Sequence, residues 1–290
     1  MKGGQQHLEK QESLEHLQEE LRNIVKWEKE QKKVWIWERI GRVPFLLLDK
    51  ITPKGIREKL GLVVNEIGSF IQTGGQYLVN HNTMMKRIEK VSQTTTNPIE
   101  EGILTLQDVG ELPLSVLDRV ADDVISKRVK FATVQGATTG IGGIFTIAVD
   151  VPLILGLSLK VLQELALCYG FDPTEKNERI FIVKCLQFAS ADVVGKKAIL
   201  EELAQFDGED RESQVFSQLK GWREVVQTYI DSFGMKKLFQ LVPVAGIFFG
   251  SISNKATIED VSEAGKMLYK KRRILRKLDE LIKGNSMTQA

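Results

Sequence analysis

The fold is decided by residues 131–149, FATVQGATTGIGGIFTIAV, a run of nineteen residues without a charge. A helix of this length could cross the hydrocarbon core of a bilayer. Only seven of the nineteen residues are large and apolar, however, and four are glycine and four are threonine. Because most of the run contributes little apolar area, it would insert poorly by itself. We therefore expect this helix to depend on packing against other helices.

Small residues in this run predict close helix contact. Ala132, Gly136, Gly140 and Gly143 are spaced four, four and three residues apart and would form one narrow stripe on a helix. Such a stripe lets a second helix approach closely. The sequence Asp150-Val151-Pro152 is typical of a helix start, and the leucine-rich segment 153–162 follows it. The pattern predicts a glycine-rich apolar helical hairpin at the centre of the fold, with Asp150 at its bend.

A second uncharged run, LFQLVPVAGIFFGSISN at 238–254, repeats this device with Gly246 and Gly250. Asn254 continues the same stripe, and if it is buried it needs a hydrogen-bond partner, for which Asp150 is a candidate. Three interpretations of the two uncharged runs stay open. They are the core of a soluble helical bundle, a shallow or re-entrant membrane hairpin, or a full membrane span.

The rest of the chain predicts an all-α multi-helix bundle. Apolar residues recur every three to four positions, and only seven of the 290 residues are proline. A long amphipathic, tryptophan-containing helix is expected from Leu8 to about Arg42. A second helix is expected from Thr52 toward Tyr77 and, in its longest form, Ile88. The turn-rich stretch SQTTTNP at 92–98 predicts a linker between an N-terminal helical region, 1–91, and a glycine-rich core, 99–290, although one single domain is also compatible.

Capping signals divide the second half of the chain. Gly170 is a good helix C-cap, and Asp172, Pro173 and Glu175 predict the start of a helix that continues toward Leu203. Further helices are expected at 215–233 and, with Thr257 and Asp260 as its capping pair, at 257–284.

One basic cluster stands out in this last helix. Its functional interpretation is contact with anionic lipid headgroups, and its structural interpretation is a solvated helix end. The cluster comprises Lys266, Lys270, Lys271, Arg272, Arg273, Arg276 and Lys277.

Composition and motifs exclude several classes of function. A net charge of +2 argues against a dedicated nucleic-acid binder. The N-terminus lacks the apolar segment of a secretory signal, and Cys168 and Cys185 form no Cys-x-x-Cys pair, which favours a reducing, cytosolic setting. His7, His16 and His81 lack a second ligand at metal spacing. No catalytic, metal-binding or cofactor-binding motif was found, so no catalytic residue, metal or cofactor is predicted.

Three blocks resemble the EcsC family: GATTGIGGIFTIAVDVPL at 136–153, CYGFDP at 168–173 and LVPVAGIFFGSISN at 241–254. The segments around Trp27 and Pro53 resemble the opening of the same family, so the similarity covers nearly the whole chain. The resemblance implies a bacterial accessory protein associated with the cell envelope or an ABC transporter, and it supplies no catalytic residue. The matching positions are Gly136, Gly140, Gly142, Gly143, Asp150, Pro152, Tyr169, Gly170, Asp172, Pro173, Pro243, Gly246, Gly250 and Asn254.

Two functional hypotheses follow. The first is a non-enzymatic accessory protein on the cytoplasmic face of the cell membrane, peripheral or partly embedded, whose partners are anionic lipid and, by the resemblance, ABC transporter subunits. The second is a soluble all-α enzyme or a binder of a small ligand or lipid, in which the apolar hairpin is simply core.

Overall fold

The computed structural model describes residues 13–32, 79–93, 105–139, 144–191, 193–204, 206 and 243–288, and at 138–139, 144–152, 193–194, 243–253 and 284–288 it describes the backbone alone. Every regular element in these ranges is an α-helix, which confirms the predicted all-α bundle. The helices are α1 (Leu14–Gln31), α5 (His81–Ser92), α6 (Leu106–Glu111), α7 (Leu114–Thr139), α8 (Ile144–Cys168), α9 (Lys176–Ser190), α10 (Val193–Ala204) and α13 (Pro243–Thr288).

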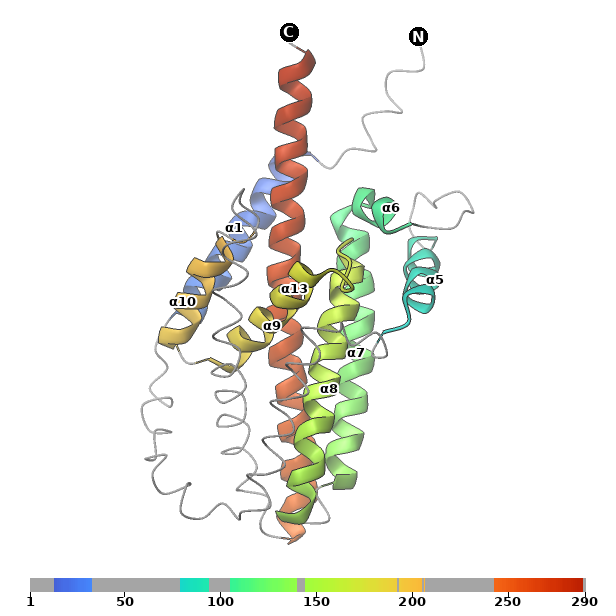
Figure 1. Ribbon diagram of the computed structural model, residues 1–290, viewed down its shortest axis with the longest axis vertical. Helices are drawn as coiled ribbons and strands as arrows, with labels where there is room; N and C mark the ends of the chain where they lie inside the picture. Colours follow the sequence, from blue (N-terminus) through green and yellow to red (C-terminus); the bar gives the residue numbers. More distant parts are fainter. Residues whose placement is uncertain are drawn as a thin grey trace.

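The centre of the fold consists of three long helices, α7, α8 and α13, which lie side by side (Figure 1). The helix α13 has 46 residues. At 1.5 Å per residue it is roughly 69 Å long and runs along the whole bundle. The helices α7 and α8 are antiparallel neighbours in the chain, and both pack against α13. The glycines between them, Gly140, Gly142 and Gly143, lie outside the described residues, so the glycine-rich part of the predicted hairpin stays a prediction.

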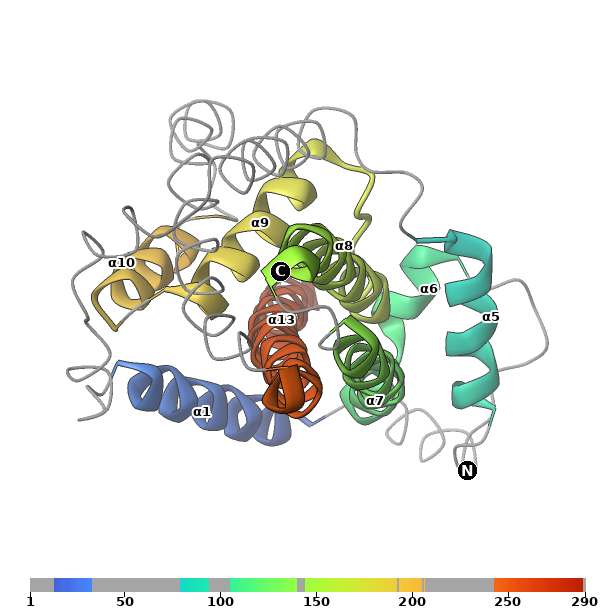
Figure 2. The ribbon, with the colours of Figure 1, turned by 90° about the horizontal axis from the view of Figure 1, so that it is seen from below.

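The shorter helices cover this centre from two sides (Figure 2). Helices α1, α9 and α10 lie on one side of α13, and α5 and α6 lie on the other side, next to α7. The helix α1 begins at Leu14, six residues later than predicted, because the side chain of Ser13 accepts a hydrogen bond from the backbone of His16 and caps it. Its apolar face buries Leu17 and Ile24. The proposed linker at 92–98 begins where α5 ends, and the domain division stays a prediction.

The turn after α8 has the geometry that the sequence predicts. Gly170 has a φ of +77°, in the left-handed region, and the N–H of Phe171 donates to the carbonyl of Ala166 at 2.9 Å. These are the features of a Schellman motif at a helix C-terminus. The next helix begins later than predicted, at Lys176, because the Asp172 carboxylate caps the local turn by accepting from the N–H of Thr174 at 2.8 Å.

The structure differs from three predictions about where helices begin, bend or continue. The helix α8 begins at Ile144, so Asp150 and Pro152 lie inside it and not at a bend. An internal proline costs a helix about 3 kcal/mol, and apolar residues on both sides of Pro152 allow packing to offset that cost. The helix α13 runs through Thr257, which is buried in its interior and does not begin a helix. The helix predicted to reach Leu203 is interrupted at Ala191, whose backbone is extended.

Candidate functional site

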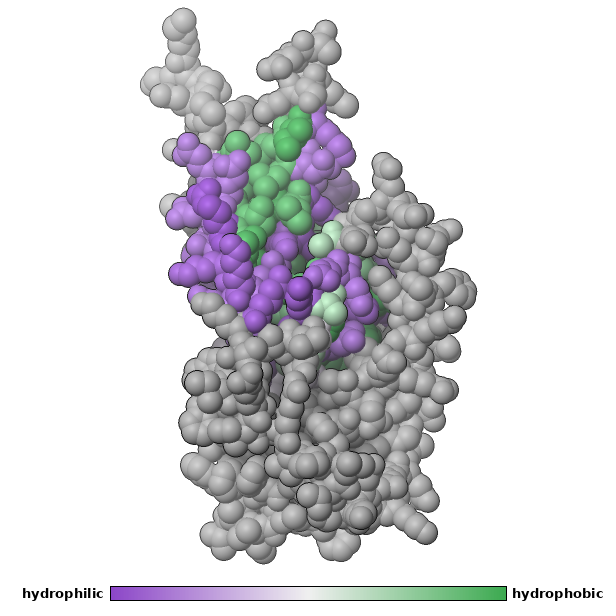
Figure 3. Space-filling view, turned by 90° about the vertical axis from the view of Figure 1, so that its left-hand side faces the viewer, coloured by the Kyte–Doolittle hydropathy of each residue, from purple (hydrophilic) through white to green (hydrophobic). Residues whose placement is uncertain are grey.

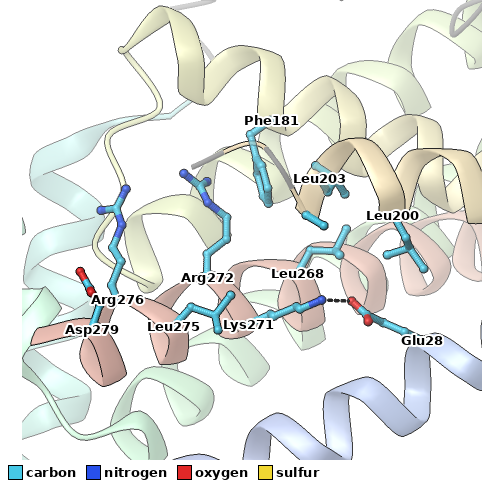
Figure 4. A pocket seen from close by; sticks show the side chains of 11 residues that line it. Glu28, Phe181, Leu200, Leu203, Leu268, Lys271, Arg272, Leu275, Arg276 and Asp279 are labelled. Atoms are coloured by element: carbon cyan, nitrogen blue, oxygen red, sulfur yellow. Dashed lines mark hydrogen bonds and ion pairs between the residues drawn. The ribbon is translucent and has the colours of Figure 1, made fainter. Parts of the chain in front are cut away.

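The basic cluster of α13 faces acidic side chains of the surrounding helices. The ammonium of Lys270 lies 2.7 Å from Asp118 of α7 and 2.5 Å from Glu20 of α1. Lys266 pairs with Asp122 of α7 at 2.5 Å, and Lys271 pairs with Glu28 of α1 at 2.7 Å (Figure 4). These pairs hold α1 and α7 against α13.

The two neighbouring arginines are buried deeper. Arg272 donates to both carboxylate oxygens of Glu178, at 2.9 and 3.1 Å, and both side chains are under 10% exposed. Burial raises the pKa of Glu178, and Arg272 opposes that shift. The guanidinium of Arg273 lies against Gly110, where an added Cβ would meet it at 3.0 Å. Removing either Arg272 or Glu178 would leave the other as an uncompensated buried charge. The Arg272–Glu178 pair therefore fixes the position of α9 on α13.

The last two members of the basic cluster, Arg276 and Lys277, contact residues in the turns that follow α8 and α6. The ammonium of Lys277 donates to the carbonyl of Leu112 at 2.7 Å. The guanidinium of Arg276 lies 4.3 Å from the ring centroid of Phe171. The seven predicted headgroup contacts are therefore placed together on one helix, and most of them face protein partners. This arrangement favours a structural role, and headgroup contact by these residues stays a prediction.

A pocket lies beside this cluster, between α1, α9, α10 and α13. Its volume is about 260 Å³. Phe181, Leu203 and Leu268 form apolar parts of its wall (Figure 4). Its charged lining has both signs and comprises Lys271, Arg272, Arg276, Glu28 and Asp279. On the side of the molecule where α1 and α10 lie, a hydrophobic strip runs between hydrophilic surfaces (Figure 3). The pocket thus combines an apolar wall with charged side chains of both signs.

The two uncharged runs meet at the end of the bundle away from the basic cluster. Helix α7 ends there, and α8 and α13 begin there (Figure 1). We call this end the uncharged pole, comprising residues 131–139 of α7, 144–149 of α8 and 243–254 of α13, none of which carries a charge. No helix among those described is long and apolar enough to cross a bilayer.

Large apolar side chains are exposed at this pole and its edge. Phe131 is 56% exposed, Val134 is 66% exposed, and Leu153 on α8 is 47% exposed. Phe131 lies eight residues before the end of α7, and Leu153 lies nine residues after the start of α8. At 1.5 Å per residue each lies roughly 12 to 14 Å along its helix from the end at the pole, so the two residues stand at a similar level.

The described family-motif positions lie on α7, α8 and α13 and in the turn after α8. Gly136 is buried in α7, and Pro243, Gly246 and Gly250 lie in the first turns of α13. Asn254 is fully buried on α13, whereas the side chain of Asp150, its predicted partner, lies outside the described side chains. Tyr169, Gly170, Asp172 and Pro173 lie in the turn after α8.

The sequence analysis missed the acidic partners of the basic cluster. Glu20, Glu28, Asp118 and Glu178 lie 94 to 250 residues away from the cations they face. Their only signal in the sequence is a position on an apolar-periodic helix face, which does not identify a partner.

The described histidines and cysteines do not come together in one site. His16 and His81 are exposed at the beginnings of α1 and α5. The described residues contain no group of three or more His, Cys, Asp or Glu side chains that could hold a metal. Both cysteines are buried as free thiols, and burial raises the pKa of each thiol, so neither has a reactive thiolate at neutral pH.

Comparison with known proteins gives a consistent assignment. The model of the EcsC protein family matches residues 18–274. The uncharacterised protein YdbA of Bacillus subtilis is 53% identical over 269 residues, which cover 93% of this chain and 97% of YdbA. Protein EcsC of the same organism is 30% identical over 190 residues, which cover 65% of this chain and 77% of EcsC. No solved structure matches the chain. The chain therefore belongs to the EcsC family.

Proposed function

We propose that this protein is a non-enzymatic accessory protein that binds the inner face of the cell membrane peripherally, with the uncharged pole as its contact. The observation that carries the proposal is the meeting of two uncharged runs, about ninety residues apart in the sequence, at one end of the bundle. Exposed apolar side chains at that end would leave water on entering the acyl region of one leaflet.

An exposed cation on α7 suits such an orientation. Lys130 is exposed and directly precedes the pole, whereas Lys127, one turn earlier, pairs with Asp123 at 3.0 Å. Cations next to an apolar segment would lie at the level of the headgroups, where each contributes about 1 kcal/mol to binding of anionic lipid. The basic cluster on α13 is a less suitable contact, because its side chains hold α1, α7 and α9 in place.

The family resemblance implies an accessory role beside an ABC transporter, with transporter subunits as partners. This role forms the second part of the proposal. A membrane-bound helical bundle is suited to that role, because binding to the bilayer restricts it to the surface on which transporter subunits lie. Co-purification with transporter subunits from detergent-solubilised membranes tests this part separately from lipid binding.

Flotation with vesicles containing phosphatidylglycerol tests the membrane contact. A variant with serine at Phe131, Val134 and Leu153 should lose at least tenfold in vesicle affinity. The reason is that each of these apolar side chains contributes up to about 3 kcal/mol to binding when it becomes fully buried in lipid. The matched control carries serine at Leu14, Leu275 and Ile282, which are 46 to 63% exposed elsewhere on the protein.

The control should float as the unchanged protein does, and flotation of both should weaken but persist at high salt, which screens the cation next to the pole but not the apolar contact. Equal flotation of both variants would contradict contact through the pole. Complete loss of flotation at high salt would mean that charge alone holds the protein on the vesicle, which would contradict apolar contact through the pole. A protein that does not float at all would favour the alternative of a soluble helical enzyme or ligand binder.

A further inference from the structure

We propose that the protein forms a weak two-fold dimer in which α1 pairs antiparallel with α1 of a second copy. The helix α1 lies at the periphery of the bundle (Figure 2), and a groove of about 500 Å³ runs along its exposed side. No residue of the uncharged pole lines this groove, so the inference does not depend on the proposed membrane contact. The described lining residues all lie on α1 and are Gln18, Leu21, Arg22, Val25, Lys26 and Lys29.

The exposed side of α1 carries a second apolar stripe, separate from the face that packs on the bundle. That inner face buries Leu17 and Ile24. On the exposed side Leu14 is 48% exposed, and Leu21 and Val25 are partly exposed. These three residues are spaced seven and four positions apart, so they lie along one side of the helix. A helix of a coiled-coil pair presents a stripe of this spacing to its partner helix.

The charges beside this stripe are not used within the described part of the protein. On the inner face, Glu20 and Glu28 pair with lysines of α13. Glu15, Arg22 and Lys26 are exposed and have no ion-pair partner among the described residues. Each of these three directly follows a stripe residue in the sequence, so together they form one flank of the stripe. This flank is acidic near the start of α1 and basic from the middle of the helix onward.

The order of these charges favours an antiparallel pair of α1 helices. In a parallel pair each residue would face its own copy, so Glu15 would repel Glu15 and Arg22 would repel Arg22. An antiparallel pair with Leu14 level with Val25 of the second copy places Glu15 between Arg22 and Lys26 of that copy. Two-fold symmetry repeats this contact at the other end. The exposed side of α1 is therefore complementary in charge to a second copy of itself.

The expected dimer is weak. The helix α1 has 18 residues and is roughly 27 Å long. A contact along one helix of this length belongs to the small class of interfaces, under roughly 1,200 Å², which hold transient complexes. Exposed ion pairs add little affinity, so the apolar stripe supplies most of the binding and the charges set the orientation. We therefore expect a dissociation constant in the micromolar range.

Sedimentation equilibrium of the full chain, at protein concentrations on both sides of that range, tests the proposal. The unchanged protein should show a monomer–dimer equilibrium. Glu15→Lys should weaken the dimer about tenfold, because it brings like charges together at two symmetry-related contacts. A variant with both Arg22→Glu and Lys26→Glu should be weakened for the same reason. An equimolar mixture of the two variants should regain the affinity, since every contact in the mixed dimer again joins opposite charges.

Two control variants separate this interface from other surfaces. Arg119→Glu reverses an exposed charge of α7 outside the groove. A variant with Phe131→Ser and Val134→Ser removes exposed apolar side chains at the uncharged pole. Both controls should dimerise as the unchanged protein does. A protein that loses membrane contact would therefore still dimerise, and the two proposals can fail independently.

A protein that stays monomeric at every concentration would overturn the proposal and leave the groove to a different partner. A dimer that the charge reversals leave unchanged would also overturn it, because that dimer would use another surface. A mixture that associates no better than either variant alone would contradict the antiparallel arrangement. If circular dichroism shows that a charge variant does not fold, Val25→Lys decides in its place. It adds a charge to the stripe and should weaken the dimer about tenfold, and an unchanged affinity would overturn the proposal.

Discussion

The hydroxyl of Tyr169 donates a hydrogen bond to Oδ1 of Asp118 at 2.6 Å. The other oxygen of the same carboxylate accepts from the ammonium of Lys270 at 2.7 Å, and that ammonium also contacts Glu20. One carboxylate of α7 thus joins the end of α8 to α13 and, through Lys270, to α1. This network gives a structural reason for the tyrosine of the CYGFDP block.

Removing this hydroxyl should destabilise the bundle. Burial and the neighbouring Asp118 carboxylate raise the pKa of Tyr169, so the phenol stays protonated and able to donate. Tyr169→Phe should lower the free energy of unfolding by about 1.5 to 3 kcal/mol, as expected for a hydrogen bond to a charged group. Urea unfolding measures this loss. In a double-mutant cycle with Asp118→Asn, strictly additive effects would show that the two side chains are not coupled.

Alanine substitutions at two glycines of the same helix region should have opposite effects. Gly170→Ala places a Cβ at a φ of +77° and 3.1 Å from the backbone of Gly110, so it should cost about 1 to 3 kcal/mol. Gly156→Ala, inside α8, meets no atom within 4 Å and should stabilise the protein by about 0.5 to 1 kcal/mol. Thermal unfolding of both variants checks the contrast, and a shift of the same sign in both would refute it.

Asp123 should contribute stability that is lost in acid. Burial opposes ionisation of this carboxyl, but hydrogen bonds from Lys127 and Arg87 outweigh burial and hold its pKa below the ordinary value of 3.8. Because the unfolded chain then binds the proton more readily, the contribution is complete above that value and disappears as the pH falls through the lower pKa of the folded state.

Thermal midpoints of the unchanged protein and Asp123→Asn measure this dependence. The difference between them should be constant above about pH 5 and should shrink below about pH 4. A difference that stays the same into strong acid would mean that the charge of Asp123 does not contribute.

The sequence was informative where structure is local. The left-handed Gly170 and the amphipathic face of α1 follow from neighbouring residues, and both were predicted in place. Local signals also misled. Thr257 and Asp260 have the spacing of a capping pair, but Thr257 is buried inside α13, where packing along 46 residues overrides a local cap.

The partners of the basic cluster could not be predicted, because they depend on which helices become neighbours. Seven cations in one helix read as a solvated or lipid-facing surface when only that helix is considered. The structure places Asp118, Asp122 and Glu28 beside them from α7 and α1. The meeting of the two uncharged runs at one pole likewise depends on the antiparallel course of α7 and α13, which no local pattern specifies.

The most direct test of the membrane contact is a fluorescent probe at the pole. Because Cys168 and Cys185 are buried with raised thiol pKa values, a cysteine at Val134 can be labelled selectively with an environment-sensitive dye, and one at Lys283, 70% exposed on the far part of α13, serves as the control. With phosphatidylglycerol vesicles, the dye at 134 should shift to the blue and be quenched by nitroxide on the lipid chains, while the dye at 283 should not change. An unchanged dye at 134 under conditions in which the protein floats would contradict the account.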